Sequence, residues 1–295
     1  MKNKKPIIIT HSGPFHIDEI LAVATIDMLL SGEYELIRTR DSEIIKTGDY
    51  VVDVGGEYNT DRNSFDHHQK DGAGDRGDGI PYSSYGLVWK KFGVDVCGSQ
   101  EVADIIDKKI GVYIDAEDNG VDVYKMNGDI NVYSLPKAIK IFHPLFGESR
   151  TFDEGFTEAF GFVKRLLERE ILKAKKYVDT KDVAIEAYDN AKDKRIIVLN
   201  EYVPAMDIIK SYPEPLFIVV PRDDNTWMVR AIEKSKNTFE ARKLFPKNWA
   251  GGKGDEIVDA TGVSDALFCH HSGNFLCIAG SKEGAIMLAQ LAVDA

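Results

Sequence analysis

The sequence lacks any long apolar run. Although 43% of its 295 residues are hydrophobic, no apolar stretch approaches the ~18 residues that cross a membrane as a helix. The N-terminal run Ile7-Ile8-Ile9 is too short for the apolar segment of a signal peptide. We therefore expect a globular protein of the cytoplasm with no membrane partner, whose length allows two domains of ordinary size.

Cysteine is also scarce. Cys97, Cys269 and Cys277 are odd in number, and no two of them form a Cys-x-x-Cys pair. The sequence therefore indicates neither a disulfide framework nor a thiolate zinc site, and we expect three buried thiols.

Positive charge is in short supply, because the chain carries 37 Lys or Arg against 48 Asp or Glu and has a net charge of −11. This balance argues against a protein that coats duplex nucleic acid through a broad basic surface. The exception is residues 192–253, which contain 12 Lys or Arg and 8 Asp or Glu. Within this span Arg222, Arg230 and Lys253 are our candidates for holding an anionic substrate.

The chain does contain alternating strand and helix patterns. Residues 5–11 are typical of a buried strand, and residues 15–30 follow as a helix. Further strands are expected at residues 34–40 and 49–54, and further helices from Ser83 or Ser84 to about residue 92 and at residues 100–113. This pattern predicts an α/β domain over residues 1–150, with a mostly parallel sheet flanked by helices.

A long helical pattern follows at residues 153–191, with Asp179-Thr180 as a candidate break. An uninterrupted helix of this length would run roughly 58 Å. We predict a connector helix over residues 151–191 and a smaller α/β domain over residues 192–295. Its expected elements are strands at residues 195–199, 216–220 and 227–231 and a helix at residues 282–293.

Asp66-His67-His68 packs three titratable side chains into three residues, a density for which a folded core has no use. A polar turn is the alternative interpretation, because short motifs give false positives. Two upstream segments favour chemistry over that alternative.

The first of these segments holds His11, His16 and Asp18 in the turn from the first strand into the first helix, and the second ends its strand at Asp53, just before two glycines. The carboxyl ends of parallel strands meet at one edge of an open α/β sheet, where such folds bind ligands. We therefore expect these side chains to converge on a metal site.

Asp118 precedes Asn119-Gly120, a turn signal that would leave its carboxylate at an exposed corner. A solvated acidic turn is the alternative. With Asp118 included, the candidate ligands combine imidazole and carboxylate without thiolate, which suits Mn, Zn, Fe or Co better than Ca. Six or seven ligands exceed the needs of one tetrahedral zinc, whereas two ions ~3.5–4 Å apart would use them all.

These segments, in this order, resemble the four motifs of the DHH phosphoesterase superfamily, which holds metal-dependent pyrophosphatases, oligoribonucleases and single-strand exonucleases. The resemblance to the melanocyte proliferating gene 1 family of metal-dependent hydrolases or 3′-5′ RNA exonucleases is closer and covers nearly the whole chain. It is carried by Thr10-His11-Ser12-Gly13, Phe15-His16-Ile17-Asp18-Glu19, Asp53-Val54-Gly55-Gly56, Asp66-His67-His68-Gln69, residues 83–88, Asp118-Asn119-Gly120 and residues 268–273.

The resemblance implies a set of metal ligands: His11, His16 and Asp118 around one ion, Asp18 and His67 around the other, and Asp53 bridging. Two positions depart from the pattern. His16 stands where the superfamily usually has its first Asp, one residue further from His11. Tyr85 stands where the closer family tends to have a small residue, which would narrow the pocket.

The resemblance also implies roles outside the ligand set. His68 would face the substrate phosphate or leaving group, and Asp66 would orient an imidazole. His270, His271, Ser272 and Gly273 look like a segment that grips a phosphate, and a satisfied histidine pair at a strand end is the alternative.

The predicted activity is that of a 3′-5′ exonuclease on single-stranded RNA or short oligonucleotides, with two Mn ions as cofactor and Zn, Co, Fe or Mg as substitutes. One alternative is a small phosphoanhydride or cyclic dinucleotide phosphohydrolase with a tighter pocket. Another is a metal-binding regulatory protein with little turnover. A homo-oligomer is compatible with each.

Overall fold

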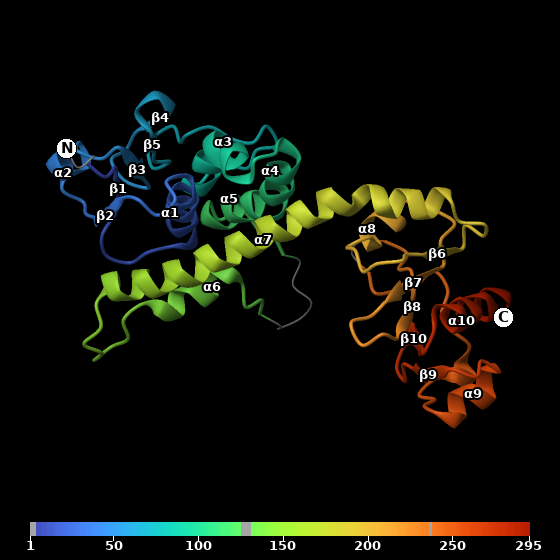
Figure 1. Ribbon diagram of the computed structural model, residues 1–295. Coiled ribbons are helices and arrows are strands. Elements are labelled where there is room, and N and C mark those ends of the chain that lie inside the picture. Colours follow the sequence, from blue (N-terminus) through green and yellow to red (C-terminus); the bar gives the residue numbers. More distant parts are fainter. Residues whose placement is uncertain (1–3, 125–130, 236–237) are drawn as a thin grey trace. The chain divides into compact units, whose positions relative to one another are not determined.

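The computed structural model describes residues 4–124, 131–235 and 238–295 (Figure 1). The chain divides into two compact units, residues 1–175 (unit 1) and residues 176–295 (unit 2), and the boundary falls inside the long helix α7 (Phe152–Asp189). No helix in the described ranges is long and apolar enough to cross a membrane.

The sheet of unit 1 has the strand order β2 (Glu35–Arg38), β1 (Ile7–Thr10), β3 (Tyr50–Val52), β5 (Ser64–Phe65), β4 (Tyr58–Asn59). Its strands pair in parallel except for β4, which is antiparallel to β5 at the edge. The four residues of β1 are all buried, as expected for an interior strand of a sheet covered on both faces. The prediction of a mostly parallel α/β sheet is confirmed.

Helices α1 (Ile17–Leu29) and α3 (Ser84–Cys97) pack against each other in unit 1. The Ser83 hydroxyl accepts a hydrogen bond from the Gly86 amide and so caps α3, as predicted. The remaining helical segments of the unit are α2 (Ser42–Ile45), a 3₁₀ turn (Thr60–Arg62), α4 (Gln100–Ile106), a π-helical segment (Asp107–Gly111), α5 (Val112–Asp118), α6 (Leu135–Ile139) and a 3₁₀ turn (Lys140–Phe142).

The expected end of one helix is wrong. The helix predicted to stop near residue 113 continues through the π-helical segment into α5 and ends at Asp118. Asn119-Gly120 marks the end of that helix, with Gly120 at φ +71°, a left-handed conformation that commonly follows a helix. Asp118 therefore belongs to a helix, and its side chain is only 15% exposed instead of lying at an open corner.

Helix α7 is continuous for 38 residues. The break considered at Asp179-Thr180 is absent, because the Thr180 hydroxyl donates back to the Lys176 carbonyl at 2.6 Å and the helix accommodates the residue. The apolar positions of its first half, including Phe156, Val163 and Leu167, are buried in unit 1 as their spacing predicts.

The sheet of unit 2 has the strand order β6 (Ile196–Val198), β7 (Phe217–Pro221), β8 (Trp227–Ala231), β10 (Leu276–Ala279), β9 (Ala266–Cys269). Only β6 and β7 are parallel. Helix α10 (Lys282–Asp294) shares one core cluster with the sheet, while the end of α7 and α8 (Met206–Ile209) share another. Helix α9 (Asp255–Thr261) and a 3₁₀ turn (Lys247–Trp249) complete the unit. The sequence did not predict β9 and β10, which are only four residues each.

Candidate metal centre

Three strands of unit 1 end at one edge of the sheet and deliver predicted site residues there. His11 follows β1, Asp53 follows β3 and Asp66 follows β5. Asp53 has φ +56°, a left-handed conformation that Asp tolerates better than most residues. The turn that ends β3 therefore begins at the functional residue itself.

One group of side chains gathers around His11. Its Nε2 lies 3.0 Å from Glu19 Oε1 and 3.2 Å from Asp53 Oδ2. The other Glu19 oxygen accepts a hydrogen bond from the His16 amide at 2.7 Å. His11, His16, Glu19 and Asp53 each offer one ligand atom within 4.8 Å of the others.

Glu19 was not among the residues expected at the metal site. The available signal was its position three residues after His16, which caps α1, because a Glu there completes a capping box by accepting from the cap residue's amide. Glu19 is fully buried, so it lies within the cluster and not on the helix surface.

A second group gathers around His67. Its Nε2 lies 3.3 Å from Asp53 Oδ1 and 3.3 Å from Asp118 Oδ2. Asp118 also lies within ligand-sharing distance of His16 and Asp18. Asp53 thus touches both groups, through Oδ2 on one side and Oδ1 on the other.

His68 and Asp66 form a pair beside these groups. His68 Nδ1 lies 2.8 Å from Asp66 Oδ1, and the second Asp66 oxygen accepts the Gly56 amide at 2.6 Å. The His68 side chain is 62% exposed, whereas that of His67 is 10% exposed. With Nδ1 bonded to Asp66, Nε2 of His68 is the ring nitrogen left for an external group.

The buried carboxylates carry more negative charge than their described neighbours neutralise. Both Asp18 oxygens are buried without a hydrogen-bond partner in the described part of the chain. Burial raises the pKa of Asp18 well above its usual value, and the carboxylates of Asp53 and Asp118 raise it further. An orphaned carboxylate of this kind fits a bound cation, because a buried charge is stable when it is paired or coordinates a metal.

The spacing of the donor atoms also fits a bound metal ion. Ligands that bind one ion at ~2.0–2.2 Å and at right angles lie roughly 3 Å apart. The nitrogen–oxygen distances around His11 and His67 are 3.0 to 3.3 Å. The donors are imidazoles and carboxylates, so the set suits a divalent transition ion.

The same contacts shift the pKa of the histidine and aspartate at the centre. Burial lowers the pKa of His11, but hydrogen bonds and charges from Asp53 and Glu19 outweigh it and raise the pKa to about 10. Burial raises the pKa of Asp53, but His11 and His67 hold it well below its usual range. Asp53 is therefore a carboxylate at any ordinary pH.

Two further side chains contact the centre. Ser84 Oγ donates to Asp53 Oδ1 at 2.9 Å, and an Arg40 guanidinium nitrogen lies 3.1 Å from His11 Nδ1. Tyr85 does not narrow a pocket as expected. Its side chain is fully buried beside Trp89, with ring centroids 5.7 Å apart, because the helix turns it into the core.

The predicted substrate residues all lie in unit 2, and the structure brings only some of them together. Residues 270–273 connect β9 to β10, with His270 Nδ1 2.7 Å from the Ser272 carbonyl and Gly273 at φ +90°. The glycines before Lys253 pair with β9 at Cys269, next to this turn. Arg230 pairs with Leu276 at the same end of the sheet.

The predicted cations differ in whether an acidic side chain already pairs with them. Arg222 lies in the turn at the opposite end of β7 and β8, where it pairs with Asp224 at 3.2 Å. Arg230 pairs with Glu233 at 2.5 Å. Lys253 makes no ion pair within the described residues, and its Nζ lies 5.8 Å from the Phe268 ring centroid.

Known proteins resemble the chain over almost its whole length. Residues 7–293 match the family model MYG1_exonuc, described as "Uncharacterised protein family (UPF0160)". A MYG1 protein of Chlamydia trachomatis serovar D is 32% identical over 93% of this chain and 92% of its own length. The MYG1 protein of Schizosaccharomyces pombe is 28% identical over 97% of both, and the MYG1 exonuclease of Rattus norvegicus is 27% identical over 97% of this chain and 84% of its own length. The chain therefore belongs to the MYG1 family, as its motifs predict.

Proposed function

We propose that this chain is a metal-dependent 3′-5′ exonuclease that hydrolyses phosphodiester bonds of single-stranded RNA or short oligonucleotides with the help of two divalent ions, of which Mn suits the donors well. The name MYG1 exonuclease, carried by relatives in Rattus norvegicus and Homo sapiens, supports the class of reaction. The observation that carries the proposal is Asp53, whose two oxygens face two different groups of histidines and carboxylates.

The proposed ligands follow these two groups. His11, His16 and Glu19 would hold one ion, and Asp18, His67 and Asp118 the other, with Asp53 between them. This assignment moves Asp118 from the ion that the family resemblance implied, because Asp118 Oδ2 lies 3.3 Å from His67 Nε2. When bound, the ions would supply Lewis acidity and a more acidic water.

The chain's own proton-transfer group in this proposal is His68. Asp66 orients its ring through Nδ1, and the exposed Nε2 would face the substrate phosphate or the leaving oxygen. A likeness to the DHH superfamily is part of the proposal and is supported by His and Asp motifs that follow parallel strands.

Unit 2 is proposed to bind substrate. Lys253, Arg230 and the turn of residues 270–273 gather at one end of its sheet, which supports a shared anion site. Arg222 lies apart from them and is a weaker candidate. The proposed division is a catalytic part (1–150), a connector (151–191) and a substrate-binding part (192–295).

A tighter pocket would suit the alternative substrates, a small phosphoanhydride or a cyclic dinucleotide, but Tyr85, the residue expected to narrow the pocket, is buried away from solvent. The open surface at His68 favours a longer substrate over a small enclosed one.

The experiment is a hydrolysis assay with Mn on pyrophosphate, dinucleotides, cyclic dinucleotides and longer single-stranded RNA. Each oligonucleotide carries a label at its 5′ end or, separately, at its 3′ end. A 3′-5′ exonuclease shortens the 5′-labelled strand stepwise and releases the 3′ label at once. Turnover that survives chelation of metal, or that is confined to pyrophosphate, would contradict the proposal.

A further inference from the structure

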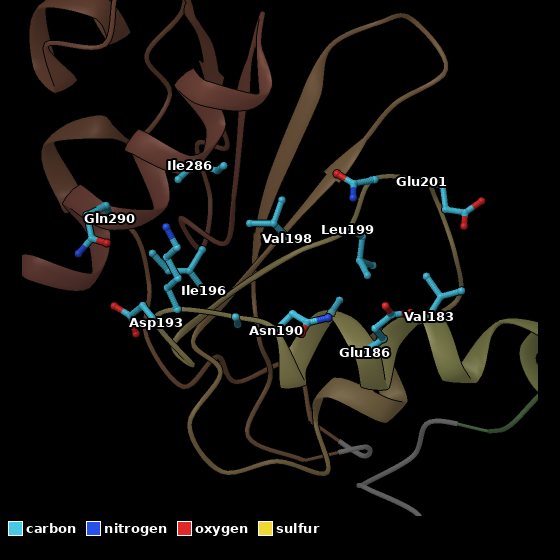
Figure 2. A pocket seen from close by; sticks show the side chains of 14 residues that line it. Val183, Glu186, Asn190, Asp193, Ile196, Val198, Leu199, Glu201, Ile286 and Gln290 are labelled. Carbon is cyan, nitrogen blue, oxygen red and sulfur yellow. The ribbon is translucent and has the colours of Figure 1, made fainter.

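A groove lies along the outer strand of the unit 2 sheet. Its volume is about 550 Å³, and it is lined by β6, by the C-terminal end of α7 with the residues that follow it, and by α10 (Figure 2). Val183 of α7 and Ile286 of α10 give it apolar walls, and Ile196 and Val198 of β6 lie between them. Every lining residue belongs to unit 2, so the groove is a property of this unit alone.

The β6 strand offers unpaired main-chain groups to this groove. In the described sheet, β6 is the outermost strand and pairs only with β7. The Arg195 carbonyl and the Leu199 amide bond to β7, so the peptide groups of Ile196 and Val198 point the other way. The Ile196 amide bonds to the Asp193 carbonyl within a turn. The Ile196 carbonyl and both main-chain groups of Val198 therefore face outward.

The two faces of the sheet beside β6 are covered by different helices. Ile196 belongs to the core cluster shared with α10, whereas Ile197 belongs to the cluster shared with the end of α7. Side chains along a strand alternate between the two faces of its sheet. A strand added to β6 would therefore place alternate side chains against Ile286 on one face and Val183 on the other.

The charges around the groove narrow the class of ligand. Glu186 and Glu201 make no ion pair within the described part of the chain, whereas Asp193 pairs with Arg195 at 2.7 Å. Lys192 is the one cation among the described residues that line the groove, and Lys282, which does not line it, donates to Asn200 Oδ1 at 2.7 Å. This excess of carboxylate disfavours a nucleic acid, which is a polyanion. It also disfavours a second copy of the chain, whose β6 edge would bring the same carboxylates.

We propose that this groove binds an extended segment of a partner protein, which adds as a strand to β6 and carries a Lys or Arg that meets Glu186 and Glu201. Strand addition draws affinity from main-chain hydrogen bonds and specificity from alternate side chains. Figure 2 shows Glu201, Leu199 and Val183 at one end of the groove, with Asp193 at the other. The basic residue of the segment therefore lies at the Leu199 end.

The test is fluorescence anisotropy of labelled octapeptides with the whole protein. Three peptides alternate Val with Lys, with Ser or with Glu. The expected order of affinity is Lys, then Ser, then Glu, with a Kd below about 1 mM for the Lys peptide. The absence of saturable binding by the Lys peptide up to that concentration, or tightest binding by the Glu peptide, would overturn the proposal.

Variants locate the binding to the groove. Val198→Pro removes an outward-facing amide but leaves the β6–β7 hydrogen bonds, because Pro is tolerated on an edge strand where its nitrogen is not in the ladder. We expect at least about a tenfold loss of affinity. Glu201→Gln should weaken the Lys peptide about fivefold, the size of a modest ion pair. Glu283→Gln, an exposed position in the same unit outside the groove, is the matched control and should change nothing.

Modified peptides test main-chain pairing without changing the protein, so this test does not depend on whether Val198→Pro folds. Two isomers of the Lys peptide carry N-methyl groups on alternate residues, odd in one and even in the other. Because only one edge of an added strand bonds to β6, one isomer should bind and the other should not. Equal binding by both isomers would show that main-chain pairing is not involved and would refute strand addition.

Discussion

The two units bury different kinds of side chain. Of the fourteen buried polar or charged residues in the described part of the chain, thirteen lie in unit 1 and only Glu233 lies in unit 2. Glu233 forms ion pairs with Lys210 at 2.7 Å and Arg230 at 2.5 Å, whereas Asp18 in unit 1 has neither an ion pair nor a hydrogen-bond partner among the described residues. Leaving such a group unpaired costs about 1–3 kcal/mol or more when it is charged.

The difference fits the separate roles proposed above for the two parts of the chain. Unit 1 tolerates an unfavourable electrostatic arrangement that a bound cation would relieve, which is the pattern expected of a reactive centre. Unit 2 has apolar cores, a buried carboxylate paired with two cations, and an open groove, which fits the binding role proposed for it.

The largest effect is expected from Asp53→Asn. Asn tolerates the left-handed backbone of Asp53, so the turn is kept while the charge that both groups share is lost. Metal-dependent turnover should fall by about 10³-fold or more, because metal charge stabilisation is worth several kcal/mol and about 1.4 kcal/mol is a factor of ten. The measurement is kcat with metal content by elemental analysis. Full metal content with wild-type turnover would remove Asp53 from the centre.

His68→Ala separates binding from chemistry within unit 1. If His68 transfers a proton and does not hold a metal, turnover should fall about 10²- to 10⁴-fold while both ions stay bound. Asp66→Asn should cost less, about 10- to 100-fold, because it disturbs only the orientation of the ring. Loss of one ion in the His68 variant would make His68 a ligand, which its closeness to Asp53 at 3.4 Å also allows.

Much of unit 1 is predictable because its signals are local. The Ile7-Ile8-Ile9 run predicts the buried interior strand β1, and the Ser83 cap predicts the start of α3. The end of α5 was misplaced because Asn-Gly ends a helix as readily as it makes a loop. The parallel sheet then explains how His11 and Asp53 meet, although 42 residues separate them.

The location of the candidate site was easier to predict than the grouping of its residues around each ion. Residue types identified His11, Asp53 and His67, but how they divide between two ions depends on distances that no spacing encodes. Glu19 went unassigned because an acidic residue in the first turn of a helix is common for electrostatic reasons alone. Tyr85 was misjudged because the face of a helix that meets the core depends on tertiary packing.

Asp18→Asn tests whether the buried carboxylate of Asp18 destabilises the folded state. In chelator-treated protein the variant should be more stable than wild type by about 1–2 kcal/mol. The raised pKa of Asp18 means that the folded state binds more protons than the unfolded state, so Asp18 destabilises the fold increasingly as pH rises above about 4. The gain in Tm should therefore grow with pH above that value.

Metal should reverse this order. With Mn added, wild type should gain more Tm than Asp18→Asn, since the ion that binds more tightly stabilises the folded state more at the same concentration. A variant that is less stable without metal, or that gains as much from Mn as wild type, would show that Asp18 is an ordinary buried carboxyl group.

The smallest effect concerns unit 2. Lys253 has no ion-pair partner among the described residues and lies beside the turn of residues 270–273, whereas Arg222 is paired with Asp224 at the other end of β7 and β8. A free cation attracts a phosphate more strongly than one already paired, because no existing ion pair must be broken. Lys253→Ala should therefore raise KM for a longer single strand about fivefold, the worth of one modest ion pair, and leave kcat and the KM for a dinucleotide unchanged.

Arg222→Ala, the matched control, should change KM by less than about twofold. Steady-state kinetics on both substrates at two salt concentrations decides the matter, because a phosphate contact weakens with salt. Equal KM values for the Lys253 variant and wild type on the longer strand would take Lys253 out of substrate binding and would leave the contrast between the units resting on unit 1 alone.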